Sequence, residues 1–245
     1  MSVATRAAVS SEPRLLDVST SRSQVIYLRT ALGLSVLAAA SLWIDLPLAN
    51  RVLVNSANAK SILPGDIRRF IALNEYFGHG LGVALIIFSV YVLDCAKRAR
   101  VVGLLVYAFG AGILADVVKF SVARVRPLRF ESDGFISSSF LGFFPSILKN
   151  TAGRTGWEIQ SFPSGHTATA VGLAIGLSRL YPQGRWLFPS FAGLVAIQRI
   201  DAGAHWLSDT LAAAALACLW AACLERWNSC QTNGSEYSGS FPSKA

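Results

Sequence analysis

The strongest constraint on how this chain can fold is a succession of apolar runs separated by short polar or basic stretches. Six such runs are present, at residues 30–46, 78–93, 101–118, 165–180, 186–198 and 204–224. A helix satisfies its backbone hydrogen bonds internally, and about 20 apolar residues cross a bilayer. The first run is short for this and is expected to begin near Ile26. The sequence therefore predicts an all-α, polytopic membrane protein with six transmembrane helices.

The composition agrees with a membrane protein. Charged residues make up 15% of the chain and apolar residues 53%, whereas soluble domains usually carry about 25% charged residues. The net charge of +8 raises the question of nucleic-acid binding, but no basic stripe with interleaved aromatics lies on a soluble module. Basic residues that flank apolar runs are better explained by anionic lipid headgroups. We therefore expect a bilayer as partner and no nucleic acid.

The polar ends of the chain frame one membrane domain. Residues 1–24 lack the apolar core of a signal peptide and are predicted to form a disordered cytoplasmic tail. Residues 25–228 are expected to form the six-span domain, and residues 229–245 a second disordered cytoplasmic tail. Short basic loops favour the cytoplasmic side, which places both termini inside, although the opposite side carries as many Lys and Arg residues.

Two segments outside the apolar runs are also informative. Pro64 to Asp66 is a helix-start signal, and the apolar residues that follow it at helical spacing predict an amphipathic helix at the membrane interface. Residues 128–162 form a long loop rich in Phe and Trp, and loops of this length are usually functional or disordered. The aromatics of this loop could contact substrate or could seat the loop on the bundle.

A histidine and an aspartate mark the start of the last run. His205 and Asp209 are four residues apart, so on a helix they would share a face. An aspartate that accepts a hydrogen bond from one imidazole nitrogen leaves the other nitrogen free to attack. The same spacing also occurs in ordinary helix-side pairs without a catalytic role.

A second histidine stands at the start of the run at 165–180. His166 follows Ser164 and Gly165, and a helix start exposes unpaired N–H groups that favour phosphate. Gly165 would allow close approach, Ser164 could donate its hydroxyl, and His166 could protonate a leaving oxygen. The alternative is plain capping, because serine is a good N-cap.

Positive charge comes from the segment that closes the third run. Lys119 and Arg126 are seven residues apart, which on a continuous helix places both on nearly one face. The two could bind phosphate oxygens, or they could only extend to the lipid headgroups. Asp116 lies one turn before Lys119 and is expected to pair with it.

Taken together, three ordered segments form a specific pattern. They are Lys119, six residues, then Arg126-Pro127; Pro163-Ser-Gly-His166; and Arg199, five residues, His205, three residues, Asp209. This pattern resembles the type-2 phosphatidic acid phosphatase family, which is itself similar to the vanadium haloperoxidases at its active site. Gln198 departs from the family pattern, which usually has serine there, and this puts the fine positioning of the phosphate in doubt.

The resemblance implies a role for each site residue. His205 would be the nucleophile and form a phosphohistidine, Asp209 would orient it, and His166 would protonate the leaving group. The phosphate would be held by the remaining residues, Lys119, Arg126, Ser164, Gly165 and Arg199. The cations would take the place of a metal, so neither a metal nor another cofactor is expected. The cysteines, Cys95, Cys218, Cys223 and Cys230, show no metal-ligand spacing.

The resemblance also implies the reaction and its setting. It indicates hydrolysis of a lipid phosphate or pyrophosphate, such as undecaprenyl pyrophosphate, phosphatidylglycerol phosphate, phosphatidic acid or lipid A. The expected location is a bacterial inner membrane, with the active site on the periplasmic or exterior face. Two alternatives remain: a lipid phosphotransferase that uses the same site, and a catalytically silent lipid-binding or transport protein. The sequence does not choose the lipid or the oligomeric state.

Overall fold

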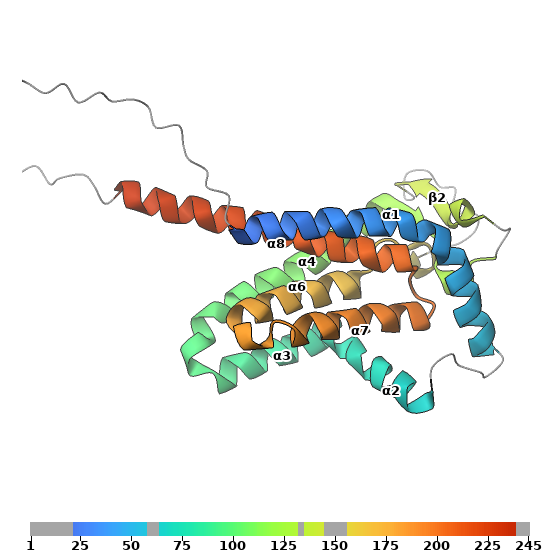
Figure 1. Cartoon of the computed structure of the whole chain (residues 1–245), viewed down its shortest axis with the longest axis horizontal. Coiled ribbons are helices and arrows are strands. Elements are labelled where there is room, and N and C mark those ends of the chain that lie inside the picture. The colour runs from blue at the N-terminus through green and yellow to red at the C-terminus, as the bar shows by residue number, and fades with distance from the viewer. Residues whose placement is uncertain (1–21, 58–63, 132–134, 145–155, 239–245) are drawn as a thin grey trace, which may run out of the picture.

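The described part of the chain, seen in a computed structural model, is a bundle of long helices (Figure 1). The structure describes residues 22–57, 64–131, 135–144 and 156–238. The α-helices are α1 (Arg22–Ala57), α2 (Gly65–Leu73), α3 (Gly80–Leu93), α4 (Val101–Ser121), α6 (Gly165–Leu180), α7 (Leu187–Asp201) and α8 (Leu207–Ser238). Each predicted apolar run lies largely within one of them, and α2 is the helix predicted after Pro64. Short 3₁₀ helices connect them: η1 (Asn74–Phe77), η2 (Cys95–Arg100), η3 (Pro127–Arg129), η4 (Ile136–Ser139), η5 (Gly156–Ile159) and η6 (Pro182–Gly184).

The first and last helices are longer than the sequence predicted. Helix α1 begins at Arg22 and continues through Pro47 to Ala57, and Figure 1 shows that it bends sharply in its last third. A proline inside a helix removes one hydrogen bond and kinks the helix without necessarily ending it. Helix α8 runs to Ser238. The predicted tails at 1–24 and 229–245 are therefore shortened by helix at 22–24 and 229–238, and their other residues lie outside the described residues.

Length and hydropathy identify fewer spans than the sequence predicted. Three helical stretches of the described residues satisfy both criteria: Arg22–Leu53, Cys95–Ser121 and Leu207–Ser229. The pair Gly65–Phe77 and Gly80–Leu93, bent by 71°, would make a fourth if it acts as one span. Helices α6 and α7 have 16 and 15 residues, which is short for a bilayer crossing. The protein is an integral membrane protein, and the prediction of six spans stays a prediction.

Helix α6 forms the centre of the bundle. It packs against α4, α7 and α8, while α1 lies along α8. Gly172 of α6 lies so close to α4 that an added Cβ would be 2.2 Å from the Tyr107 carbonyl oxygen. Small residues at helix contacts allow this close packing, which is the main attraction between helices in lipid. Large apolar side chains such as Leu32, Phe88 and Ile113 stay exposed on the outside, where a bilayer would cover them.

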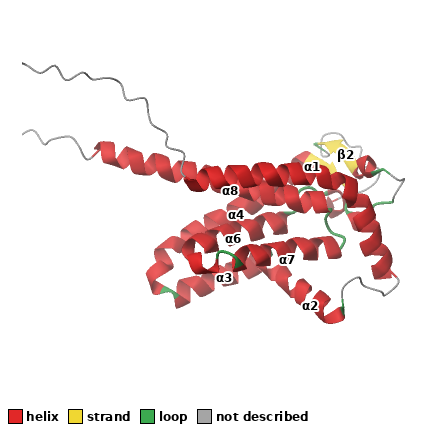
Figure 2. Ribbon diagram, in the orientation of Figure 1, coloured by secondary structure: helices red, strands yellow, loops and turns green. Residues whose placement is uncertain are grey.

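A small antiparallel hairpin interrupts the helical bundle. Strand β1 (Val122–Arg124) pairs with β2 (Phe140–Phe143), shown in yellow in Figure 2. The all-α prediction did not include it. Because α4 ends at Ser121, the prediction that Lys119 and Arg126 share one helix face is wrong. Val122 and Val125 are β-branched, and Pro127 disfavours helical conformation in the residue before it, so this stretch extends and pairs with β2.

Candidate active site

The three motif segments meet at one end of the bundle. The C-terminal ends of α4 and α7 and the N-terminal ends of α6 and α8 lie there, because these helices alternate in direction. An added Cβ on Gly165 would be 3.3 Å from the Lys119 ammonium nitrogen, so these two segments touch. The charges of Arg126 and Arg199 act on His205. The fold thus brings together the residues that the sequence singled out.

His205 lies in the loop before α8 and is almost completely buried. Its Nδ1 is 2.6 Å from the carbonyl oxygen of Ser161. Because a carbonyl oxygen only accepts, we assign the proton to Nδ1, which leaves the lone pair on Nε2. Burial lowers the pKa of His205 below its usual value, and Asp209 opposes that shift. The contact with Ser161 therefore leaves the Nε2 lone pair free, and burial disfavours the charged form of the ring.

The predicted hydrogen bond between His205 and Asp209 is not formed. The Asp209 Oδ2 atom is 3.8 Å from Nδ1, too far for a hydrogen bond. The helical spacing argument fails here because α8 begins only at Leu207, so His205 is not helical. Asp209 instead accepts from the Ser161 hydroxyl at 2.5 Å and from the Trp206 backbone N–H at 2.9 Å. Asp209 thereby fixes Ser161, which binds the ring, and Trp206, which follows His205 in the chain.

A buried arginine that sequence reasoning missed supports Asp209. The Arg124 guanidinium is fully buried and contacts the carboxylates of Asp209 and Asp45, the latter at 2.8 Å. Its Nη1 also donates to the Ser208 hydroxyl at 2.7 Å. The available signal was weak: a single aspartate in the first apolar run, and an arginine in an apolar stretch two residues before Arg126. Charges in such places usually have a partner.

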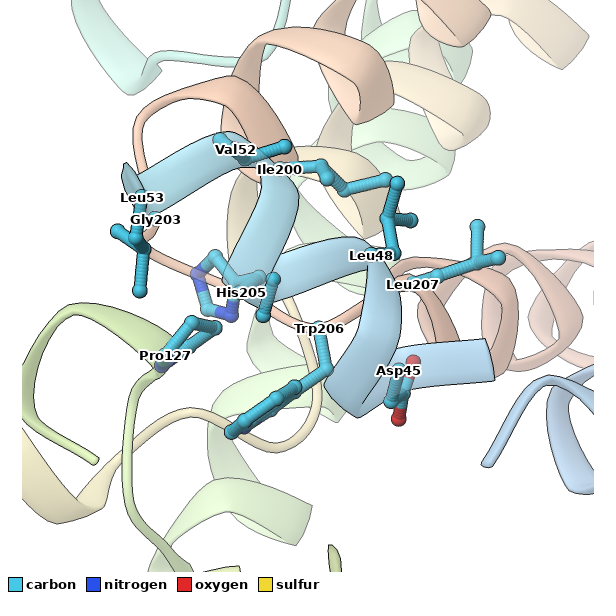
Figure 3. Close-up of a pocket in the computed structure, with 11 residues that line it drawn as sticks. Asp45, Leu48, Val52, Leu53, Pro127, Ile200, Gly203, His205, Trp206 and Leu207 are labelled. Atoms are coloured by element: carbon cyan, nitrogen blue, oxygen red, sulfur yellow. The ribbon is translucent and has the colours of Figure 1, made fainter. Parts of the chain in front are cut away.

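The bent end of α1 closes the back of the His205 loop. Figure 3 shows His205 beside Pro127, and Leu48 and Val52 of α1 line the same cavity. The cavity between them is about 10 Å³, which leaves room for no more than about one water molecule. The indole N–H of Trp206 donates to the Val125 carbonyl oxygen at 2.8 Å. This side of the site is a packed support and not a substrate entrance.

A larger cavity lies at the start of α6. This cavity of about 350 Å³ is lined by Lys119, Gly165, His166 and His79 among others. The His166 Nε2 atom is buried and has no hydrogen-bond partner among the described residues. The hydroxyl oxygen of Ser164 accepts from the Thr167 N–H at 3.4 Å and caps α6, as the capping alternative expected. His79 is a cavity residue that the motifs did not indicate.

The cations of the site differ in their partners. Lys119 pairs with Asp116 at 3.1 Å, which confirms that prediction. Arg126 donates to the Trp157 carbonyl oxygen at 2.7 Å and lies over that indole ring. Burial and the neighbouring Arg199 lower the pKa of Arg126. Cations that repel one another in a partly buried site create an environment that an anion would stabilise.

Arg199 is paired with a carboxylate that the motifs do not contain. Its Nη1 atom is 2.5 Å from Glu75 Oε1, and the Gln198 amide donates to Glu75 Oε2 at 3.0 Å. Glu75 belongs to η1, far from Arg199 in the sequence. Among the described residues, no group of three or more His, Cys, Asp or Glu could hold a metal ion.

Comparisons with known proteins identify relatives of this chain. Lipid A 1-phosphatases of Rhizobium johnstonii and Rhizobium etli are each 32% identical over 102 residues, which is 42% of this chain. The match spans only 37% and 39% of the length of these relatives. Two crystal structures share the fold. Aquifex aeolicus LpxE has a TM-score of 0.50 at 20% identity and covers 77% of this chain and 95% of its own.

The second crystal structure is that of a Bacillus subtilis protein, described as the first transmembrane PAP2 type phosphatidylglycerolphosphate phosphatase. Its TM-score is 0.53 at 17% identity. It covers 86% of this chain and 98% of its own. A family model described as the PAP2 superfamily matches residues 100–232, more than half of the chain and all three motif segments. The chain belongs to the PAP2 superfamily.

Proposed function

We propose that this protein is a metal-independent phosphatase that acts on a membrane lipid phosphate or pyrophosphate through a phosphohistidine at His205. The observation that carries the proposal is the fixed tautomer of His205, whose Nδ1 is bound to the Ser161 carbonyl oxygen at 2.6 Å. This leaves Nε2 as a nucleophile next to the positive charges of Arg126 and Arg199. An imidazole with its Nε2 lone pair free beside two guanidinium groups suits attack on a phosphate.

The reaction would proceed in two displacements. In the first, Nε2 of His205 forms a bond to phosphorus, the bond from phosphorus to the lipid oxygen breaks, and His166 donates a proton to that oxygen. In the second, His166 takes a proton from water, the water oxygen attacks phosphorus, and the N–P bond breaks. Lys119, Arg126 and Arg199 would stabilise the charge on the equatorial oxygens in both steps. Ser164 and Gly165 would place the N-terminus of α6 against the same oxygens.

The surroundings of the site suit a lipid substrate. An apolar cavity of about 450 Å³ lies between α1, α6, α7 and α8 and is lined by residues such as Val171, Ile175 and Leu211. Thr167, one residue after His166, also lines it, so the cavity reaches the site end of α6. The similar proteins act on lipid A and phosphatidylglycerol phosphate according to their names. Undecaprenyl pyrophosphate and phosphatidic acid carry the same reactive group.

The membrane arrangement is part of the proposal. Helices α6 and α7 would add two short spans, α3 one, and α1, α4 and α8 three, while α2 would lie at the membrane interface. The site would face the exterior of a bacterial inner membrane, with both termini in the cytoplasm. The basic residues Lys97, Arg98 and Arg100 support this orientation, because they precede α4 whereas Lys119 and the site lie at its other end.

Phosphate release from a panel of lipids tests the proposal. The purified protein would be assayed in detergent with EDTA, and substrate labelled with ³²P would be used to trap the acid-labile phosphohistidine. We expect release without added metal, and no turnover or labelling in His205→Ala. Transfer of label to a second lipid instead of water would indicate a phosphotransferase. Near wild-type activity in His205→Ala, or activity lost in EDTA and restored by magnesium, would contradict the mechanism.

A further inference from the structure

Glu75 is the least expected residue of the site. It lies in the elbow, residues 65–78, which consists of α2, η1 and Gly78 and leads into α3. One carboxylate oxygen accepts from Arg199 at 2.5 Å and the other from the Gln198 amide at 3.0 Å. Oε1 is also 3.7 Å from Nε2 of His166. A single carboxylate thus contacts two neighbouring side chains at the end of α7 and borders the proposed general acid.

Two further contacts fix the elbow in this position. Arg68 of α2 pairs with Asp201, the last residue of α7, at 3.0 Å. Gly78 lies so close to α6 that an added Cβ would be 2.5 Å from the His166 carbonyl oxygen. The elbow therefore contacts the C-terminal end of α7 and the N-terminal end of α6, and both of these ends carry site residues. Glu75 reaches Arg199 from a rigid support and not from a free loop.

The contact with Glu75 leaves most of the Arg199 guanidinium available. A guanidinium has five N–H donors in a planar fork, and the hydrogen bond to Glu75 uses Nη1. The Nε atom of Arg199 is buried and has no partner among the described residues, and the same holds for Nε2 of His166. Buried polar atoms without a hydrogen-bond partner are rare in folded proteins. Here they lie in the site proposed to receive phosphate oxygens.

We infer that Glu75 is a positioning residue, which fixes the Arg199 guanidinium so that its remaining N–H groups meet the substrate phosphate. Gln198 holds the second carboxylate oxygen and thereby fixes Glu75. The inference rests on the proposed function. It also accounts for the departure from the family pattern, because the Gln198 amide serves the carboxylate and does not need to reach the phosphate. The opposite possibility, a carboxylate that competes with phosphate for Arg199, predicts tighter anion binding once Glu75 is neutralised.

Orthovanadate inhibition separates these possibilities. Vanadate mimics the five-coordinate phosphorus, so its Ki reports on the geometry of the cations. We expect Glu75→Gln to raise the vanadate Ki and lower kcat/KM by about tenfold, the effect of one charge-assisted hydrogen bond. Asp66→Asn is the matched control, because it removes an exposed carboxylate from the same elbow, and it should change neither value.

A double-mutant cycle shows whether Glu75 acts through Arg199. In the Arg199→Ala background, Glu75→Gln should change the vanadate Ki by less than about twofold. The double variant Glu75→Gln with Gln198→Glu exchanges the two side chains and keeps one carboxylate beside Arg199. It should recover part of the lost affinity for vanadate. A purely structural role would instead lower thermal stability and reduce affinity equally in both backgrounds.

The outcomes distinguish this inference from the proposed function. If the wild type hydrolyses lipid phosphate but Glu75→Gln leaves Ki unchanged or lowers it, the positioning role is refuted and the phosphatase assignment stands. The same holds if the loss persists in the Arg199→Ala background. If the wild type neither binds vanadate nor releases phosphate, the proposed function fails and the inference fails with it.

Discussion

Removal of the Arg124 guanidinium should cost more stability than any other single change of a charged residue at this end of the bundle. The side chain is fully buried between Asp45 and Asp209, whose side chains are also fully buried. Arg124→Leu would leave two buried carboxylates without their cation. Breaking one partner of a buried ion pair costs about 3–5 kcal/mol. This is a large share of the roughly 5–15 kcal/mol by which domains are usually stable.

The measurement is reversible unfolding in mixed micelles by titration with SDS, followed by circular dichroism. Arg129→Leu is the matched control, because Arg129 is half exposed and its pair with Glu158 has a distance of 3.4 Å. Exposed pairs contribute about 0–1 kcal/mol. If Arg124→Leu does not accumulate, Arg124→Lys is measured instead. It should lose about 1–3 kcal/mol, because an ammonium group cannot bridge both carboxylates with a planar fork.

Coupling between the partners provides the sharper test. With Arg124→Leu already present, Asp45→Asn removes an unpaired buried charge, so the double variant should lose less than the sum of the two single losses. We expect the difference to be at least about 1 kcal/mol. A loss below about 1 kcal/mol for Arg124→Leu, equal to that of Arg129→Leu, would refute the reasoning. Additive losses in the double variant would do the same.

Three further outcomes follow from the site and its surroundings. Because burial lowers the pKa of His205, the acidic limb of the pH profile of kcat/KM should lie below about pH 6.5, the pKa of a free histidine. The profile is corrected for titration of the substrate phosphate. An acidic limb above that pH would contradict the buried nucleophile. Phe143→Ser with Phe144→Ser should lower kcat/KM for a long-chain lipid and spare a short, soluble phosphate ester; an equal fall for both, with lower thermal stability, would make the aromatics structural. An impermeant thiol reagent on intact cells should label a cysteine introduced at Ser138 but not Cys95, and the reverse pattern would overturn the orientation.

The sequence was sufficient to predict the helical elements of the fold. Apolar runs of this length form helices in a membrane because a helix satisfies its backbone hydrogen bonds within one segment, and the run at 165–180 coincides with α6. The pairing of Lys119 with Asp116 was predictable for the same reason, since residues one turn apart on a helix are neighbours. These features depend only on residues close together in the chain.

The sequence alone also predicted which residues gather at the site. Motif spacing identified Lys119, His166, Arg199 and His205, and alternating helix directions were enough to place them at one end. The orientation of His205 was not predictable, because it depends on the Ser161 carbonyl oxygen, 44 residues away in sequence. Asp209, the expected hydrogen-bond partner of His205, does not bind its ring, because α8 begins two residues after His205.

The rest was decided by tertiary structure, because it depends on contacts between distant segments. Strand β1 forms only because β2 pairs with it, and this removed Arg126 from the helix of Lys119. Arg124 meets Asp45 across 79 residues, and Arg199 meets Glu75 across 124 residues. A lone charge in an apolar run reveals that it needs a partner, but only the packing of α1 and of the elbow against the motif segments determines which partner it has.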